Sequence, residues 1–201
     1  MASNDNFRKT PFLDPEVVSI VDKITPLLRP LASPVIELLL GLAIEIAREG
    51  REGRRIGTIF MIGDVDSVLR HSRPLILDPL LGHADAARWV ADENLWGTIK
   101  ELAQLDGAFV VSASGTFVAA CRYLDAKASN LDLPFGLGAR HVAAAAMSKI
   151  TSSIGIVVSE TANIRIFRSG QLIVRISCSP KARLHKILPL ADLAPLASNA
   201  G

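Results

Sequence analysis

Three short groups of residues in this chain combine acids, a cation and an imidazole with small residues. The groups are Asp106-Gly107-Ala108, Gly138-Ala139-Arg140-His141 and Val158-Ser159-Glu160. Each group falls where a predicted helix or strand begins or ends. Carboxylates with substrate phosphates can hold a divalent metal, and basic side chains at a helix start can hold phosphates. This combination is suited to binding a nucleoside triphosphate with its metal and to moving a phosphoryl group.

The first group lies between a predicted helix and a predicted strand. Gly107 accepts a positive φ and Asp106 can bond to the local backbone, so an ordinary turn is one explanation. The functional interpretation places the carboxylate at the end of a sheet, where it holds a divalent metal or polarises a hydroxyl. The small Gly107 and Ala108 then let a base or a phosphate approach the backbone. Both interpretations stay open on these residues alone.

The second group continues a glycine-rich loop into a predicted helix that starts near Ala139. The free N–H groups and the positive end of the helix dipole make such a start an anion site. Arg140 and His141 add donors at the same place. Basic residues in a first turn oppose the helix dipole, so a bound anion explains them better than a solvated turn does.

Two further features surround these groups. Ser159 and Glu160 follow a predicted buried strand, and ligands of α/β proteins collect at the carboxyl ends of strands. A carboxylate there suits Mg²⁺ or Mn²⁺, with a solvated turn acid as an equal alternative. Tyr123 ends another predicted strand beside Leu124 and could flank an adenine ring, although an aromatic residue at the edge of the core is the commoner case.

The elements that position these groups alternate between helices and strands. The predicted helices cover 14–28, 34–49, a short stretch from 66, one or two turns over 85–90, 92–105 and 139–149. The predicted strands cover 56–63, 109–113, 116–123, 154–159, 163–168 and 171–178, with irregular chain over 74–83 and 125–138. This order predicts an α/β fold: a single domain with a mixed central β-sheet wrapped by helices, plus N-terminal helices.

Composition narrows the class of protein. The chain has 201 residues, 49% of them hydrophobic, and a net charge of +2, so no nucleic-acid partner is expected. Cys121 and Cys178 lie in apolar runs and are expected to be reduced core thiols of a cytoplasmic protein. The longest apolar stretch, 34–47, is interrupted by Glu37 and Glu45 and is too short to span a membrane.

The order of these motifs resembles the diadenylate cyclase (DAC) domain, the nucleotide-binding domain of DNA-integrity-scanning proteins. The resemblance covers about residues 56–178. It implies an enzyme that condenses two ATP molecules into cyclic di-AMP, releases two pyrophosphates and uses Mg²⁺ or Mn²⁺. It also implies a homo-oligomer in which two domains meet face to face. On this basis we divide the chain into an N-terminal helical extension (1–55), a diadenylate cyclase catalytic domain (56–180) and a C-terminal tail (181–201).

The resemblance also implies roles for individual residues. Asp106, Arg140 and His141 are expected to be catalytic, with Asp106 acting near the ribose 3′-hydroxyl. The metal is expected on Asp106 and Glu160. The nucleotide is expected to contact Gly107, Ala108, Tyr123, Leu124, Gly138, Ala139, Arg140, His141 and Ser159.

Two positions depart from the pattern of the family. Many members have Gly-Thr-Arg-His-Arg where this chain has Gly-Ala-Arg-His-Val. Ala139 lacks a hydroxyl that could bond a phosphate, and Val142 lacks a cation. A protein that senses ATP or cyclic di-AMP without turnover is therefore one alternative. A regulatory subunit whose helices over 14–49 dock a partner is another.

Overall fold

The fold is built on one mixed sheet. The structure, a computed structural model, describes residues 14–28, 33–127 and 129–178, and the predicted tail lies outside them. Within these residues seven strands follow the order β2-β4-β3-β1-β5-β6-β7. β1 runs parallel to β3, and the other neighbouring pairs are antiparallel. The strands are β1 (Thr58–Ile62), β2 (Ser72–Pro74), β3 (Ala108–Val111), β4 (Phe117–Leu124), β5 (Ile154–Ser159), β6 (Asn163–Arg168) and β7 (Gln171–Ser177).

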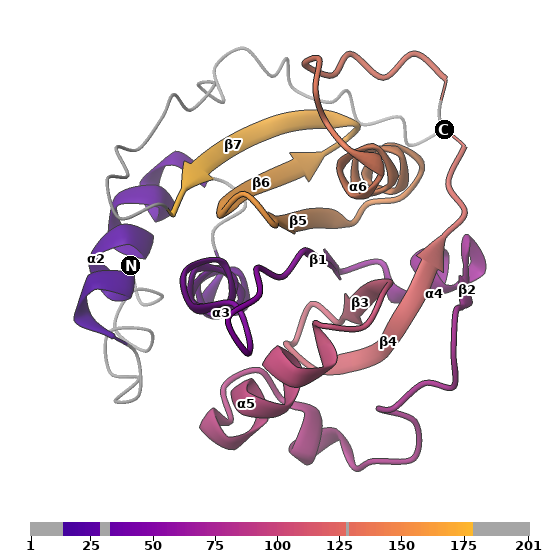
Figure 1. The fold of residues 1–201 in the computed structure, drawn as a ribbon. Helices are drawn as coiled ribbons and strands as arrows, with labels where there is room; N and C mark the ends of the chain where they lie inside the picture. Colours follow the sequence, from indigo (N-terminus) through magenta and orange to yellow (C-terminus); the bar gives the residue numbers. More distant parts are fainter. Residues whose placement is uncertain (1–13, 29–32, 128, 179–201) are drawn as a thin grey trace.

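Helices cover both faces of this sheet (Figure 1). They are α2 (Pro15–Ile24), η1 (Thr25–Leu28), α3 (Pro34–Glu49), α4 (Val65–Arg70), η2 (Asp85–Arg88), α5 (Glu93–Leu102) and α6 (Ala139–Ile150). The apolar residues of α2, α3 and α5 form one buried cluster with one face of the sheet. Those of α4 and α6 form a second cluster with the opposite face. Within the described residues, every helix is too short or too polar to cross a bilayer. The predicted α/β fold with a mixed sheet wrapped by helices is confirmed.

The central helix on the first face is α3, which is buried on nearly all sides from Ile36 to Ala47. Its charged residues pair with the neighbouring helices. Lys100 of α5 lies 2.6 Å from Glu45 and 2.9 Å from Glu49, and Arg48 lies 2.6 Å from Glu16 of α2. The two N-terminal helices thus share the core of the sheet. The division of the chain at residue 55 stays a prediction.

Two helix boundaries and one strand differ from those expected, each for a local reason. The first helix ends at Ile24, and a 3-10 turn follows because Pro26 has no N–H for an α-helical bond. Helix α5 ends at Leu102 instead of residue 105, and i→i+3 bonds tighten the next turns. The short edge strand β2 was not predicted. Arg122 of β4 secures β2 by donating to the hydroxyl and the carbonyl of Ser72 at 3.1 and 2.8 Å.

The strand directions bring the predicted site residues to one edge of the sheet. Because β4 and β5 are antiparallel to their neighbours β3 and β1, the ends of β4 and β5 lie beside the starts of β1 and β3. The turn before β3 carries Asp106, and the turn after β5 carries Glu160. Helix α6 leads back into β5 and therefore begins near the same edge.

Candidate active site

A pocket of about 870 Å³ opens at this edge of the sheet. Its lining includes the predicted residues Asp106, Gly107, Tyr123, Leu124, Gly138, Ala139, Arg140, His141, Ser159 and Glu160. Ala108 was also predicted to contact the nucleotide, but it is not part of this lining. It begins β3, and its side chain is fully buried in the core. The lining also includes Val158, from the third group, and residues that were not predicted as part of the site, namely Ile59, Leu75, Ile76, Arg122 and Ala143.

The guanidinium of Arg140 joins the two predicted metal-binding acids. Its NH2 lies 3.2 Å from Oδ1 of Asp106, and its NH1 lies 2.9 Å from Oε1 of Glu160. Both acids stay largely open to solvent, with exposed side-chain fractions of 85% for Asp106 and 61% for Glu160. Two carboxylates from distant parts of the chain therefore lie within the span of one guanidinium. Among the described residues there is no group of three side chains suited to a metal.

Gly57, just before β1, makes room for this arrangement. A Cβ atom at this position would lie 2.7 Å from NH1 of Arg140 and 3.4 Å from Cγ of Glu160. The φ of Gly57 is not in the left-handed region, so glycine is favoured here by the close approach of Arg140 and not by the backbone conformation. The sequence signal was present, since an isolated glycine at the start of a buried strand often marks a close neighbour. The sequence analysis did not use it.

The turn that carries Asp106 is fixed by a bulge in the neighbouring strand. Gly107 has a φ of +111°, and a Cβ on it would lie 2.6 Å from the carbonyl carbon of Cys121. Cys121 itself has a φ of 53°, and the register between β3 and β4 shifts between Ala108 and Val110. Both the positive φ and the close packing on β4 therefore require glycine at residue 107. This packing holds the carboxylate of Asp106 at the pocket.

Helix α6 presents an uncapped N-terminus to the pocket. Gly138 is the N-cap residue and provides no side-chain bond, and the first turn contains no acidic residue. The first N–H groups of a helix have no partners within the helix. The N-terminus therefore offers N–H donors and a positive dipole end at the place where Arg140 projects.

His141 is almost completely buried, with 7% of its surface exposed. NH1 of Arg165, on β6, donates to its Nε2 at 2.8 Å, and the ring packs edge-on against Phe167. Burial, with the like charges of Arg165 and Arg140, lowers the pKa of His141 to about 4. The imidazole is therefore neutral at physiological pH. The sequence analysis did not identify Arg165, although an arginine between the buried Ile164 and Ile166 was a visible signal.

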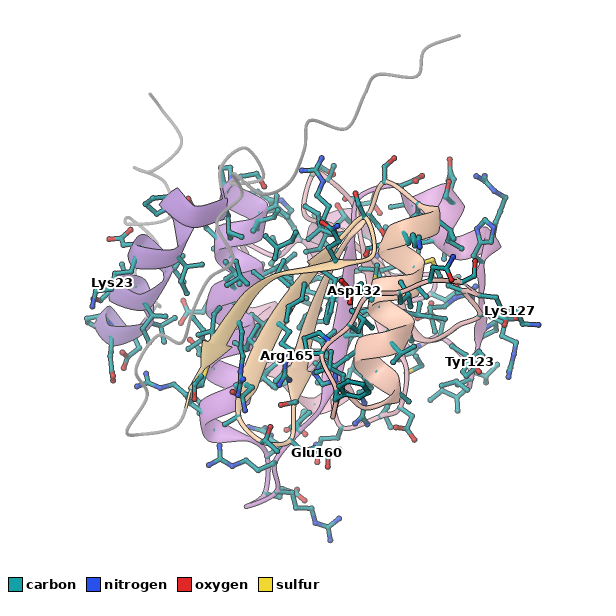
Figure 2. The ribbon with its side chains drawn as sticks, turned by 90° about the horizontal axis from the view of Figure 1, so that it is seen from above. Lys23, Tyr123, Lys127, Asp132, Glu160 and Arg165 are labelled. Carbon is teal, nitrogen blue, oxygen red and sulfur yellow. The ribbon has the colours of Figure 1, made fainter. Side chains whose placement is uncertain are left out.

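The far wall of the pocket is partly apolar. Tyr123 is 45% exposed, and the guanidinium carbon of Arg73 lies 4.6 Å from the centroid of its ring. Leu75 and Ile76, which follow β2, line the pocket with 40% and 49% of their surfaces exposed. Figure 2 labels Tyr123 and Glu160, which come from β4 and from the turn after β5. This wall is suited to a flat, partly apolar group.

The hydroxyl of Ser159 helps to shape the turn between β5 and β6. It lies 2.8 Å from the hydroxyl of Thr161 and accepts from the backbone N–H of Asn163 at 3.3 Å. The carboxylate of the next residue, Glu160, is turned toward Arg140. Ser159 lines the pocket, and its role toward a phosphate stays a prediction.

Two curated relatives of this chain are both diadenylate cyclases. The chain is 47% identical over 136 residues to a diadenylate cyclase of Methanocaldococcus jannaschii, a match that covers 67% of this chain and 43% of that protein. It is 39% identical over 143 residues to a diadenylate cyclase of Haloferax volcanii, covering 71% of this chain and 52% of that protein. The chain therefore spans about half the length of these curated relatives.

A solved structure shares the fold. The crystal structure described as that of the hypothetical membrane spanning protein from Bacillus cereus is 18% identical to this chain. It aligns with a TM-score of 0.54 over 78% of this chain and 70% of its own. At this identity the likeness concerns the arrangement of helices and strands alone.

The family described as DisA bacterial checkpoint controller nucleotide-binding matches residues 45–172. This range begins inside α3 and includes every segment that lines the pocket. It also includes Arg165 and the bulged strand β4. The chain therefore belongs to the DAC family, the nucleotide-binding domain family of the DisA checkpoint controller.

Proposed function

We propose that this chain is a diadenylate cyclase, which condenses two ATP molecules into cyclic di-AMP and releases two pyrophosphates. The observation that carries the proposal is the contact of Asp106, Arg140 and Glu160 in one pocket at the start of α6. A volume of about 870 Å³ lies within the range of small-molecule sites. The activity of the two curated relatives supports the proposal.

The pocket suggests how ATP is oriented. The apolar wall at Tyr123, Leu124 and Ile76 is suited to the adenine ring. The N-terminus of α6 is suited to the phosphates, because it combines N–H donors with the positive end of a helix. Arg140 adds a charged donor between the two regions. We therefore expect the adenosine to lie toward β4 and the triphosphate toward α6.

The donor set fits a divalent metal. Asp106 and Glu160 supply carboxylate oxygens that lie close together and are accessible. Mg²⁺ is commonly held by one or two carboxylates with substrate phosphates, and the same oxygen donors suit Mn²⁺. A metal held there would offset negative charge on the phosphates. Arg140, held between the two carboxylates, would direct its remaining donors to the phosphate oxygens.

The chemistry requires two pockets that face each other. The 3′-oxygen of one ATP forms a bond to the α-phosphorus of the other, and the bond from that phosphorus to pyrophosphate breaks. Asp106 accepts the proton of the 3′-hydroxyl. The attacking and leaving oxygens lie roughly in line in such transfers, so one pocket cannot present both substrates to each other. A face-to-face homo-oligomer can, and a second identical step closes the ring.

Product analysis of two matched variants tests the proposal. The protein is incubated with ATP and either Mg²⁺ or Mn²⁺, and products are identified by mass spectrometry. Asp106→Asn should retain ATP binding and lose cyclic di-AMP formation. Asp66→Asn, an acid at the opposite end of β1, should behave as the unmodified protein does. Product formation by Asp106→Asn at the unmodified rate would remove Asp106 from the mechanism, and ATP binding without turnover by the unmodified protein would favour a sensor.

The two-pocket mechanism has its own test. Specific activity should rise with protein concentration through the range in which the protein associates, as measured by sedimentation. A constant specific activity in a protein shown to be monomeric would contradict the mechanism. We also propose a cytoplasmic location, where ATP is available. The two free, buried cysteines, Cys121 and Cys178, are consistent with a reducing compartment.

A further inference from the structure

Arg165 and His141 form a contact between the sheet and the first turn of α6. NH1 of Arg165 lies 2.8 Å from Nε2 of His141. Figure 2 labels Arg165, on β6 of the sheet. A guanidinium has donors and no acceptor, so Arg165 donates and Nε2 accepts. An imidazole that accepts at Nε2 carries its proton on Nδ1. The contact therefore selects one of the two neutral tautomers of His141.

We propose that Arg165 is a positioning residue that fixes the tautomer and the ring orientation of His141 in the nucleotide pocket. The proposal rests on the function proposed above. It follows that His141 serves as a neutral donor through Nδ1–H. That nitrogen is buried and makes no hydrogen bond of good geometry among the described residues, and only the backbone of Gly138 lies near enough for a weak one. A poorly satisfied buried donor is costly, and both His141 and Gly138 belong to the lining of the pocket.

The charges around the ring agree with a neutral His141. Arg140 precedes it on α6, Arg165 lies on β6, and Arg175 faces Arg165 from β7. The acids on this side of the pocket, Asp106 and Glu160, are already bonded to Arg140. A carboxylate at the position of Arg165 would accept from the ring and favour its protonated form. An arginine donates instead and disfavours that form.

No acidic side chain among the described residues pairs with Arg165, in contrast to Arg48, Arg51 and Arg88. Its guanidinium is partly buried, and its hydrogen bond goes to the imidazole. Burying a cation without an acid is costly. The contact of Arg165 with His141, a residue that lines the pocket, therefore contributes little to stability. Its cost is consistent with a role in function.

Three variants separate positioning from a structural role. Arg165→Met keeps an apolar stem and removes the donor, Arg165→Lys keeps a donor and the charge, and Arg175→Ala removes a neighbouring arginine that does not contact the ring. The readouts are the ¹⁵N shifts of the His141 imidazole, assigned by their loss in His141→Gln, together with the ATP dissociation constant, kcat and KM. Imidazole ¹⁵N shifts report the tautomer directly.

In Arg165→Met we expect both tautomers of His141, a higher pKa of that ring, and a kcat/KM lower by about tenfold to a hundredfold, as for other residues that orient a functional group. Arg165→Lys should restore the Nδ1–H tautomer and most of the activity. Arg175→Ala should match the unmodified protein.

An unchanged tautomer in Arg165→Met overturns the inference, whether or not the protein turns ATP over. A changed tautomer with unchanged ATP affinity and activity also overturns it. If neither the unmodified protein nor any variant makes cyclic di-AMP, the proposed function is wrong. In that case a changed tautomer with weaker ATP binding in Arg165→Met still supports the positioning role.

Discussion

Gly57→Ala should reduce activity while leaving the fold intact. The new Cβ would lie 2.7 Å from NH1 of Arg140 and 3.2 Å from its Cζ. Ordinary van der Waals contact begins near 3.4 Å, so NH1 must move by at least 3.4 − 2.7 = 0.7 Å. The bond from NH1 to Glu160 is 2.9 Å long and the one from NH2 to Asp106 is 3.2 Å. A shift of this size away from Glu160 carries the first bond beyond hydrogen-bond distance.

The effects on stability and on activity should therefore separate. The displaced group is the end of a flexible side chain in a largely exposed ion pair, worth roughly 0.2–1 kcal/mol. Replacing glycine with alanine where the backbone allows it stabilises by about 0.4–1 kcal/mol. The free energy of unfolding should thus change by less than about 1 kcal/mol. A misplacement of roughly 1 Å at a reacting site can lower the rate about a hundredfold, so we expect kcat/KM to fall more than tenfold.

The assay pairs urea unfolding with the rate of cyclic di-AMP formation. Gly97→Ala is the matched control, because a Cβ at Gly97 on α5 meets nothing within 4 Å. That variant should keep full activity. If Gly57→Ala also keeps the ATP affinity and kcat/KM of the unmodified protein, the placement of Arg140 between the two acids is not needed for function.

Three further predictions follow from the same pocket. Arg140→Ala should raise the ATP dissociation constant by roughly tenfold or more, the value of a charge-assisted bond; calorimetry that shows no change would exclude a phosphate contact. Gly107→Ala should lower the free energy of unfolding by roughly 2–4 kcal/mol, because its φ of +111° and the contact with β4 both oppose a side chain; unaltered urea unfolding would contradict this. Burial lowers the pKa of His141 from 6.5 to about 4. As the pH falls, the unfolded chain therefore binds the proton before the folded chain does. The free energy of unfolding should fall by up to about 3 kcal/mol between pH 6.5 and pH 4. Urea unfolding across this pH range should show a smaller fall in His141→Gln, and an equal fall in both proteins would contradict the assignment.

Local signals predicted most of the elements. The hairpin of β6 and β7 follows from alternating apolar residues around Ser169 and Gly170. Both residues adopt positive φ in the structure, as a tight hairpin turn requires. The uncapped start of α6 also follows from its sequence, because Gly138 cannot cap and the first turn is basic. These features depend on residues within a few positions of one another.

Local sequence signals could not predict contacts between residues that are far apart in the sequence. The sequence identified Asp106, Arg140 and Glu160, but their contact joins residues that are 34 and 20 positions apart. The bulge at Cys121 leaves the apolar run of β4 uninterrupted, so the pattern does not reveal it. The strand β2 is three residues long and ends in proline, which is too short to show a period. Its position depends on Arg122.

The most direct test of the account supplies an equal mixture of ordinary ATP and ATP labelled in its adenosine. The products formed with Mg²⁺ or Mn²⁺ are weighed by mass spectrometry. Condensation of two ATP molecules predicts that half of the cyclic di-AMP carries one labelled and one unlabelled adenosine, with one pyrophosphate released for each ATP consumed. A protein that binds ATP and yields only products containing a single adenosine would contradict the account.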